Sequence, residues 1–320
     1  MNIKIKTQPA YFNCISLLFF GLVFVACNPN KPEDKKKTYA LNKEKESEVG
    51  AKYYFTITNN TETYAEVKSE KVSNTSFSTI CFIWEDMYDS AGKQNVKITY
   101  DSIYSKMKNG NQEKEINSGN AAYSINPAEK MLGLLKGSSI VVSLNSNGEV
   151  VSVSGYQEIT DKLLSEAQIN DLSQRKQITE QFNNLLGENF VKSNIGLSQA
   201  LLPDSTVHIG ESWTKNENDN NELHIPITTT YTLTDVTNNV ATIKSTAEIK
   251  NANGVNILGT GAQFKEIQGS IKSTFQKDLA TGLLKGLTSQ IKIKGDMQIM
   301  AMTVPAEIIV KREIQSRKIK

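Results

Sequence analysis

Two long parts of this chain alternate apolar and polar residues with a period of two, and this alternation most constrains what the chain can fold into. Each part predicts a run of strands rich in Tyr, Val, Ile and Thr, separated by polar turns, which is typical of an antiparallel meander. The first set of predicted strands is Tyr53 to Thr58, Tyr64 to Val72, Ser78 to Tyr88, Asn95 to Met107, Ser138 to Leu144 and Glu149 to Ser154. The second set is Ile225 to Val236, Val240 to Lys250, Phe264 to Asp278, Leu283 to Lys294 and Met297 to Lys311.

Short turn signals connect several of these strands. Asn145-Ser146-Asn147-Gly148, Asn238-Asn239 and Thr281-Gly282 each lie between two predicted strands and favour hairpins, because Asn and Gly tolerate the positive φ of tight turns. Pro305 cannot donate a backbone hydrogen bond, so we expect it at a sheet edge or a bulge.

Residues 157–201 change to helical spacing. Their apolar residues recur three and four positions apart, and Asp171 is a candidate N-cap. A shorter helix is predicted over Pro127 to Lys136, with Gly137 at its stop. The expected fold class is therefore α+β, with two antiparallel β-meanders forming curved sheets or a half-barrel around a central helical segment in 157–201.

The N-terminus has the layout of a bacterial lipoprotein signal peptide. Lys4 and Lys6 precede an apolar core over Ile15 to Ala26, and Cys27 follows the small residue Ala26. The core is shorter than the roughly 20 apolar residues of a membrane-spanning helix. We therefore predict residues 1–26 as a cleaved signal peptide and Cys27 as the lipidation site.

The residues after Cys27 are predicted to form a tether. Lys31 to Glu48 is dense in Lys and Glu and has few large apolar residues, which is typical of a segment without a packed core. The expected organisation is a lipidated N-terminus and flexible charged tether over 27–49, followed by a single β-rich domain over 50–320.

Charge and cysteine content exclude several functions. The two signal-peptide lysines account for the difference between 36 Lys+Arg and 34 Asp+Glu, so the remaining chain is formally neutral and nucleic-acid binding is not expected. Cys81 is the single cysteine after Cys27, in the apolar run Ile80-Cys81-Phe82-Ile83-Trp84, and is predicted to be buried and unreactive.

No arrangement of residues predicts catalysis, a metal or a cofactor. The chain has two histidines, His208 and His224, each beside strand-like sequence, and it lacks a Gly-x-Ser-x-Gly elbow. The segment Asn216 to Glu222 offers clustered oxygens without the glycine and spacing of an EF-hand loop. We therefore expect no catalytic residues, no metal site and no cofactor, and predict that the protein is not an enzyme.

The most distinctive stretch after Cys27 is Leu201 to Trp213, which contains Pro203, Val207, Gly210, Glu211 and Trp213. In this Pro-x3-Val-x2-Gly-Glu-x-Trp element, and in the late hairpin around Thr281-Gly282, the chain resembles an uncharacterised family of Bacteroidota lipoproteins. The resemblance implies a fold element at these positions, with Trp213 anchoring the turn in the core, and implies no known activity.

Two functions follow as hypotheses. The first is a non-enzymatic, lipid-anchored binding module whose pocket, lined by strands of both meanders, holds an apolar ligand or partner, since the layout looks similar to the half-barrel of lipoprotein carriers. The alternative is a surface structural or adhesive lipoprotein that binds glycan or protein through exposed strand faces, with Tyr100 and Tyr104 on one face. The expected location is the cell envelope, anchored in the outer membrane, on the periplasmic face or at the cell surface.

We predict that Cys27 carries the lipid anchor. Metabolic labelling with palmitate is expected to mark the wild-type protein and to vanish in Cys27→Ala, because several acyl chains on one residue are what hold a protein stably at a membrane. Cys81→Ala is the control and should keep its label. Label that persists in Cys27→Ala would contradict the prediction.

Overall fold

The structure is a computed structural model. It describes residues 37–41, 48–67, 70–88, 94–125, 127–145, 150–191, 194, 202–203, 205–217, 225–252, 255–256, 263–299 and 302–319. The predicted signal peptide, Cys27 and His224 lie outside the described residues. Within the described part of the chain, no helix is both long and apolar enough to cross a membrane.

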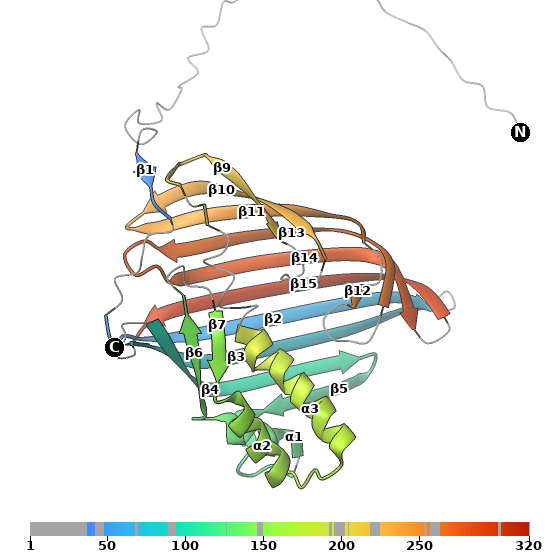
Figure 1. The fold of residues 1–320 in the computed structure, drawn as a ribbon. Coiled ribbons are helices and arrows are strands. Elements are labelled where there is room, and N and C mark those ends of the chain that lie inside the picture. Colours follow the sequence, from blue (N-terminus) through green and yellow to red (C-terminus); the bar gives the residue numbers. More distant parts are fainter. Residues whose placement is uncertain are drawn as a thin grey trace, which may run out of the picture.

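The dominant element is one open antiparallel sheet of thirteen strands (Figure 1). Its main path runs β7-β6-β4-β3-β2-β15-β14-β13-β11-β10-β9, while β5 pairs with β4 and β12 with β13. The strands of the first half are β2 (Lys52–Val67), β3 (Glu70–Tyr88), β4 (Gln94–Asn109), β5 (Gln112–Asn117), β6 (Ser139–Leu144) and β7 (Val150–Ser154). Those of the second half are β9 (Ser212–Glu217), β10 (Ile227–Thr237), β11 (Val240–Ala252), β12 (Val255–Asn256), β13 (Gln263–Asp278), β14 (Leu284–Ile299) and β15 (Met302–Lys318).

Both predicted meanders are present, and the last strand joins them. The predicted limits of two strands are wrong, because β2 runs unbroken from Lys52 to Val67 across the gap expected between Thr58 and Tyr64, and β3 begins at Glu70, inside the predicted strand Tyr64 to Val72. β15 pairs with β2 in a continuous register from Ala306↔Ala65 to Lys318↔Tyr53. The two meanders therefore form halves of a single open sheet, so of the two expected arrangements, curved sheets or a half-barrel, the one with more than one main sheet is wrong.

The helices gather at one end of this sheet instead of at its centre (Figure 1). Buried residues of three helices pack with strands β2, β3, β4 and β6 in one apolar cluster, whereas the clusters on the second meander contain no helix residue among those described. The α+β description thus fits only loosely. The helices are α1 (Pro127–Leu135), α2 (Tyr156–Glu166), α3 (Leu172–Leu185) and α4 (Glu188–Val191), with a 3-10 turn, η2, over Ser118–Asn120.

Alternation gives the sheet an inner face, which carries the helices and the buried side chains, and an outer face. Phe55 and Ile57 of β2 and Ile314 of β15 lie on the inner face and are almost completely buried. One row of directly paired residues on this face, which we call a register row, is apolar across seven strands and lies at the centre of the core. Its members are Ile243, Phe275, Leu287, Ile314, Ile57, Ile80 and Ile103.

The local turn and cap signals are largely confirmed. Asn238 and Asn239 have φ of 50° and 61° and connect β10 to β11, and Gly282 has φ of 69° between β13 and β14. The carboxylate of Asp171 accepts a hydrogen bond from the backbone N–H of Gln174 at 2.9 Å, so it caps α3. Pro305 pairs only with β14, because the pairing of β15 with β2 begins at the next residue.

Part of the predicted tether is packed on the domain. β1 (Thr38–Tyr39) pairs antiparallel with β8 (Val207–His208), and Leu41 is only 1% exposed. Leu41 packs in a cluster with Leu202, Val207 and residues of β10 and β11. The expectation of a free segment over 27–49 is therefore wrong at residues 37–41. The many Lys and Glu residues of this segment led to the prediction of a tether, because a single leucine changes its composition little. That leucine, Leu41, is nevertheless part of the core.

We predict that Leu41→Ala destabilises the domain by about 2–4 kcal/mol, since it removes a fully buried leucine from a packed cluster. Urea unfolding of the mature protein measures the change. Val49→Ala, in the same N-terminal segment but 71% exposed, is the matched control and should change stability by less than about 0.5 kcal/mol. Equal midpoints for the two variants would show that the docking of this segment contributes nothing.

Candidate functional site

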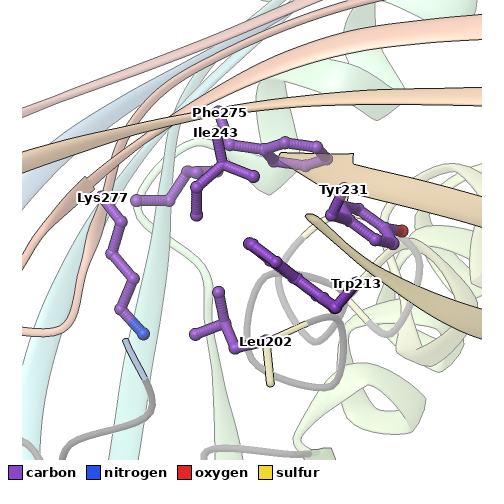
Figure 2. Close-up of a pocket in the computed structure, with 7 residues that line it drawn as sticks. Leu202, Trp213, Tyr231, Ile243, Phe275 and Lys277 are labelled. Carbon is purple, nitrogen blue, oxygen red and sulfur yellow. The ribbon is translucent and has the colours of Figure 1, made fainter. Parts of the chain in front are cut away.

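A small apolar cavity lies on the inner face of the second meander (Figure 2). Trp213 of β9 stacks on Tyr231 of β10 with ring centroids 5.8 Å apart, and Phe275 of β13 tilts toward Tyr231 at 6.2 Å. Figure 2 shows Lys277 entering on the side opposite Tyr231. The lining residues are Leu202, Trp213, Tyr231, Ile243, Phe275, Lys277 and Leu284.

This cavity does not match the predicted ligand pocket. Its volume of about 20 Å³ has room for about one water molecule, whereas pockets for small ligands are typically about 300–1,000 Å³. Its strand residues come from the second meander alone, and it contains an ionisable group, Lys277. This cavity is therefore not the apolar pocket predicted between both meanders.

Lys277 is the most perturbed base of this region. Its side chain is only 3% exposed, and the cost of burying an ammonium group lowers its pKa to about 8. It stands on the inner face because the alternation of β13 places it beside Phe275. Sequence reasoning missed this residue, since one lysine in a strand is normally assigned to solvent.

Trp213 was predicted to anchor the central turn in the core. The turn itself is at Gly210, which has φ of 88°, and Trp213 lies three residues later in β9. Trp213 is half-buried and packs against the cluster that contains Leu41 and Tyr231. The residue therefore closes one side of this cluster instead of filling its centre.

A polar row crosses the inner face beside the apolar row. Ser273 and Ser289 share a hydrogen bond at 2.9 Å, and Nε of Arg312 donates to Oδ1 of Asn59 at 2.8 Å. Burial lowers the pKa of Arg312 to about 10. This row separates the apolar row from a second apolar cluster that includes Ile291 and Val310, so the inner-face side chains that the structure describes do not form one continuous apolar surface. Its members are Ser245, Ser273, Ser289, Arg312, Asn59, Ser78 and Ser105.

A second hollow, larger than the inner cavity, lies on the outer face, and we call it the outer groove. It encloses about 560 Å³ across β11, β13, β14, β15 and β2, which lie side by side in the middle of the sheet (Figure 1). Alternation directs Lys272, Thr288 and Lys311 away from the inner face, toward the groove. The residues of the outer-face rows that border it are Thr58, Asn60, Lys244, Thr246, Lys272, Thr274, Thr288, Gln290, Lys311 and Glu313. Ser245, Ser273, Ser289 and Arg312 also border it, because their row lies between the two outer-face rows, although alternation directs their side chains to the inner face.

Two register rows run through the outer groove and continue onto the first meander. One row ends at Tyr104 and the other contains Phe77, so polar and aromatic side chains share one surface. The first row is Lys244, Thr274, Thr288, Glu313, Thr58, Thr79 and Tyr104, and the second is Thr246, Lys272, Gln290, Lys311, Asn60, Phe77 and Lys106. From β11 to β4 the rows cross six strand spacings, or about 29 Å.

Phe77 and Tyr104, which we call the aromatic pair, flank the groove. Their ring centroids are 6.0 Å apart in an edge-on arrangement, and Phe77 is 37% exposed although it is a large apolar side chain. Phe77 is the cross-strand partner of Asn60, which borders the groove. The aromatic pair therefore continues the surface of the groove on β3 and β4.

The expectation that Tyr100 and Tyr104 share one face is wrong. The pairing of β3 with β4 shifts by one residue between Cys81 and Phe82, which is a β-bulge, so Tyr100 is turned to the inner face and is 1% exposed. The hydroxyl of Tyr100 donates to the carbonyl oxygen of Leu186, and burial raises its pKa. Only Tyr104 remains on the outer face.

The remaining predicted residues contribute no chemistry to this surface. Cys81 is half-buried on the outer face of β3, with its Sγ 3.8 Å from Oγ1 of Thr56, so the prediction of full burial is wrong. His208 lies in β8, and its Nδ1 is 3.3 Å from the carbonyl oxygen of Lys37. No group of three or more His, Cys, Asp or Glu side chains is placed to hold a metal ion in the described ranges.

The family of unknown function DUF6263 matches residues 91–284. The chain belongs to this family. This confirms the expected membership of an uncharacterised family, and the match includes Tyr104, Lys244 and Lys272 of the outer face.

Other comparisons add no functional information. No curated protein matches the chain. Among solved structures, an outer membrane channel from Pseudomonas putida F1 is 8% identical with a TM-score of 0.20, covering 86% of this chain and 98% of that chain. MucB in complex with MucA is 6% identical with a TM-score of 0.12, covering 82% and 88%. A botulinum neurotoxin serotype C1 binding domain is 7% identical with a TM-score of 0.12, covering 84% of each chain. These scores are too low to support an argument about fold or function.

We predict a pH dependence that identifies the buried amine of Lys277. Its folded-state pKa of about 8 is below the ordinary value of 10.5, so between these pH values the unfolded state binds more protons and stability rises with pH. The free energy of unfolding of the wild type should therefore gain about 3 kcal/mol relative to Lys277→Met between pH 8 and pH 10.5.

Denaturant unfolding at a series of pH values measures this difference. Below pH 8 both states are protonated at Lys277, so the difference between wild type and variant should level off there. Lys285→Met, on the neighbouring strand and exposed, is the matched control for loss of a lysine. A difference that stays constant from pH 8 to pH 10.5 would contradict the buried position of the amine.

Proposed function

We propose that the protein is a non-enzymatic, lipid-anchored module of the cell envelope that binds glycan chains on the outer face of its sheet. Of the two hypotheses from the sequence, this is the adhesive one. The proposal rests on the two register rows that carry hydroxyl, amide and ammonium groups across the groove and include the aromatic pair on the first meander.

The chemistry of these rows suits a sugar chain. The hydroxyls of Thr274 and Thr288 and the amide of Gln290 can both donate and accept hydrogen bonds, as sugar hydroxyls require. The exposed ring of Phe77 offers an apolar surface for the C–H groups of a sugar ring. An open groove of about 560 Å³ that continues for about 29 Å along the strand rows also fits a chain better than a compact molecule.

The binding of an apolar ligand is less well supported. The inner cavity has about 20 Å³, and the polar row with Arg312 divides the inner face. The exposed groove also lacks the enclosure that gives apolar ligands their affinity.

The test uses the mature protein and a panel of soluble polysaccharides in native affinity gels, with dextran as the neutral member and polygalacturonate and chondroitin sulfate as acidic members. The wild type should be retarded by at least one of them. The double variant Phe77→Ala/Tyr104→Ala should lose roughly tenfold or more in affinity, because each aromatic contact contributes on the order of 1 kcal/mol.

Tyr123→Ala is the matched control, since Tyr123 is 95% exposed and lies outside the groove, and it should bind as the wild type does. Circular dichroism checks that the double variant is folded. Equal binding by the double variant and the wild type would exclude this site. Failure of the wild type to bind any polysaccharide would overturn the glycan proposal in favour of a protein partner.

A further inference from the structure

The lysines of the outer groove restrict the class of glycan. We infer that the groove takes an acidic polysaccharide, one that carries carboxylate or sulfate groups at intervals along its chain. This inference rests on the proposed function and specifies its ligand.

Three lysines, Lys244, Lys272 and Lys311, border the groove, but only one carboxylate among its bordering residues, that of Glu313, does. Lys244 and Lys272 are exposed, and neither has an ion-pair partner in the part of the chain that the structure describes. Lys311 lies 3.3 Å from Glu62 and remains half exposed. The mature chain is formally neutral, so this excess of positive charge is a local property of the groove.

The arrangement differs from that of charges elsewhere on the outer face. Lys250 lies 2.8 Å from Glu248, and Lys292 lies 2.9 Å from Glu307, so these neighbouring lysines are neutralised within the protein. Within the groove, Lys272 is instead flanked in its row by Thr246 and Gln290. Positive charge without a protein partner is most easily satisfied by an anion from outside.

The spacing suits a repeating chain. Lys272 and Lys311 belong to the same row and are separated by β14, so their strands are about 10 Å apart. Lys244 lies in the neighbouring row, one strand beyond Lys272. Three ammonium groups along one direction can contact successive acidic groups of a polymer, whereas a single small anion could reach at most one or two of them.

The experiment compares polygalacturonate, chondroitin sulfate and dextran as ligands for the lipid-free mature protein at several salt concentrations. We expect at least one acidic polymer to bind and dextran to bind at least tenfold more weakly, with affinity for the acidic polymer falling as salt rises. In Lys244→Gln/Lys272→Gln, affinity for the acidic polymer should fall roughly tenfold and its dependence on salt should become shallower. Lys130→Gln/Lys162→Gln, which removes two exposed lysines from α1 and α2, is the matched control and should bind as the wild type does.

The outcomes separate the two proposals. Equal binding of dextran and the acidic polymers, with loss of binding in the aromatic double variant, would overturn the acidic ligand and leave the glycan-binding function standing. If Lys244→Gln/Lys272→Gln and the control Lys130→Gln/Lys162→Gln lose affinity for the acidic polymer to the same degree, the groove is not the binding site and the attraction is nonspecific. If no polymer binds, both proposals fail.

Discussion

The pairing of β15 with β2 is the constraint on which the rest of the structure depends. It joins the last long strand of the chain to the first, and Arg312 and Asn59, which form a hydrogen bond across it, are 253 residues apart. Both faces of the sheet use this seam. On the inner face it places Ile314 beside Ile57 in the apolar row, and on the outer face it places Lys311 beside Asn60 in the groove. A contact of such sequence separation costs loop-closure entropy before it stabilises the fold, so the seam is expected to form late in folding.

The core and the outer groove are two consequences of the same alternation. In β13, Phe275 contributes to the core while the adjacent Thr274 borders the groove. A register slip of one residue would exchange the two sets, which would expose the apolar row and bury lysines. The cost of burying those charges therefore helps to fix the register that the apolar residues favour. The bulge in β4 shows the local version of this effect, because a single extra residue separates Tyr100 from Tyr104 onto opposite faces.

Features set by neighbouring residues could be predicted from the sequence, and features set by distant ones could not. The positive φ of Asn238 and Asn239 and the capping of α3 by Asp171 follow from local chemistry. The β2–β15 seam carries no local signal, and the helices show an apolar stripe without indicating which part of a sheet it contacts. The burial of Leu41 and Lys277 was missed for the same reason. Leu41 is buried by residues more than 100 positions later in the chain. Lys277 is buried by the strand pairing of the second meander. On the outer face, Tyr104 was identified from the sequence. Phe77 and the groove lysines could be assigned to the same surface only once the strand register was known.

The docked N-terminal segment bears on how the groove would be presented at a membrane. If Cys27 is lipidated, ten residues, 28–37, separate the anchor from β1, and ten residues span at most about 36 Å in any conformation. β1 lies at the end of the sheet formed by β9 and β10, away from the helices (Figure 1). That end would therefore be held near the lipid surface. The register rows begin at β11, near that end of the sheet, and extend about 29 Å to β4, where Tyr104 lies beside Phe77 of β3. A bound glycan chain would therefore run from the membrane side of the domain toward its distal end. Under the proposed lipidation and glycan binding, the packing of Leu41 would impose this direction, whereas a tether without that packing would not.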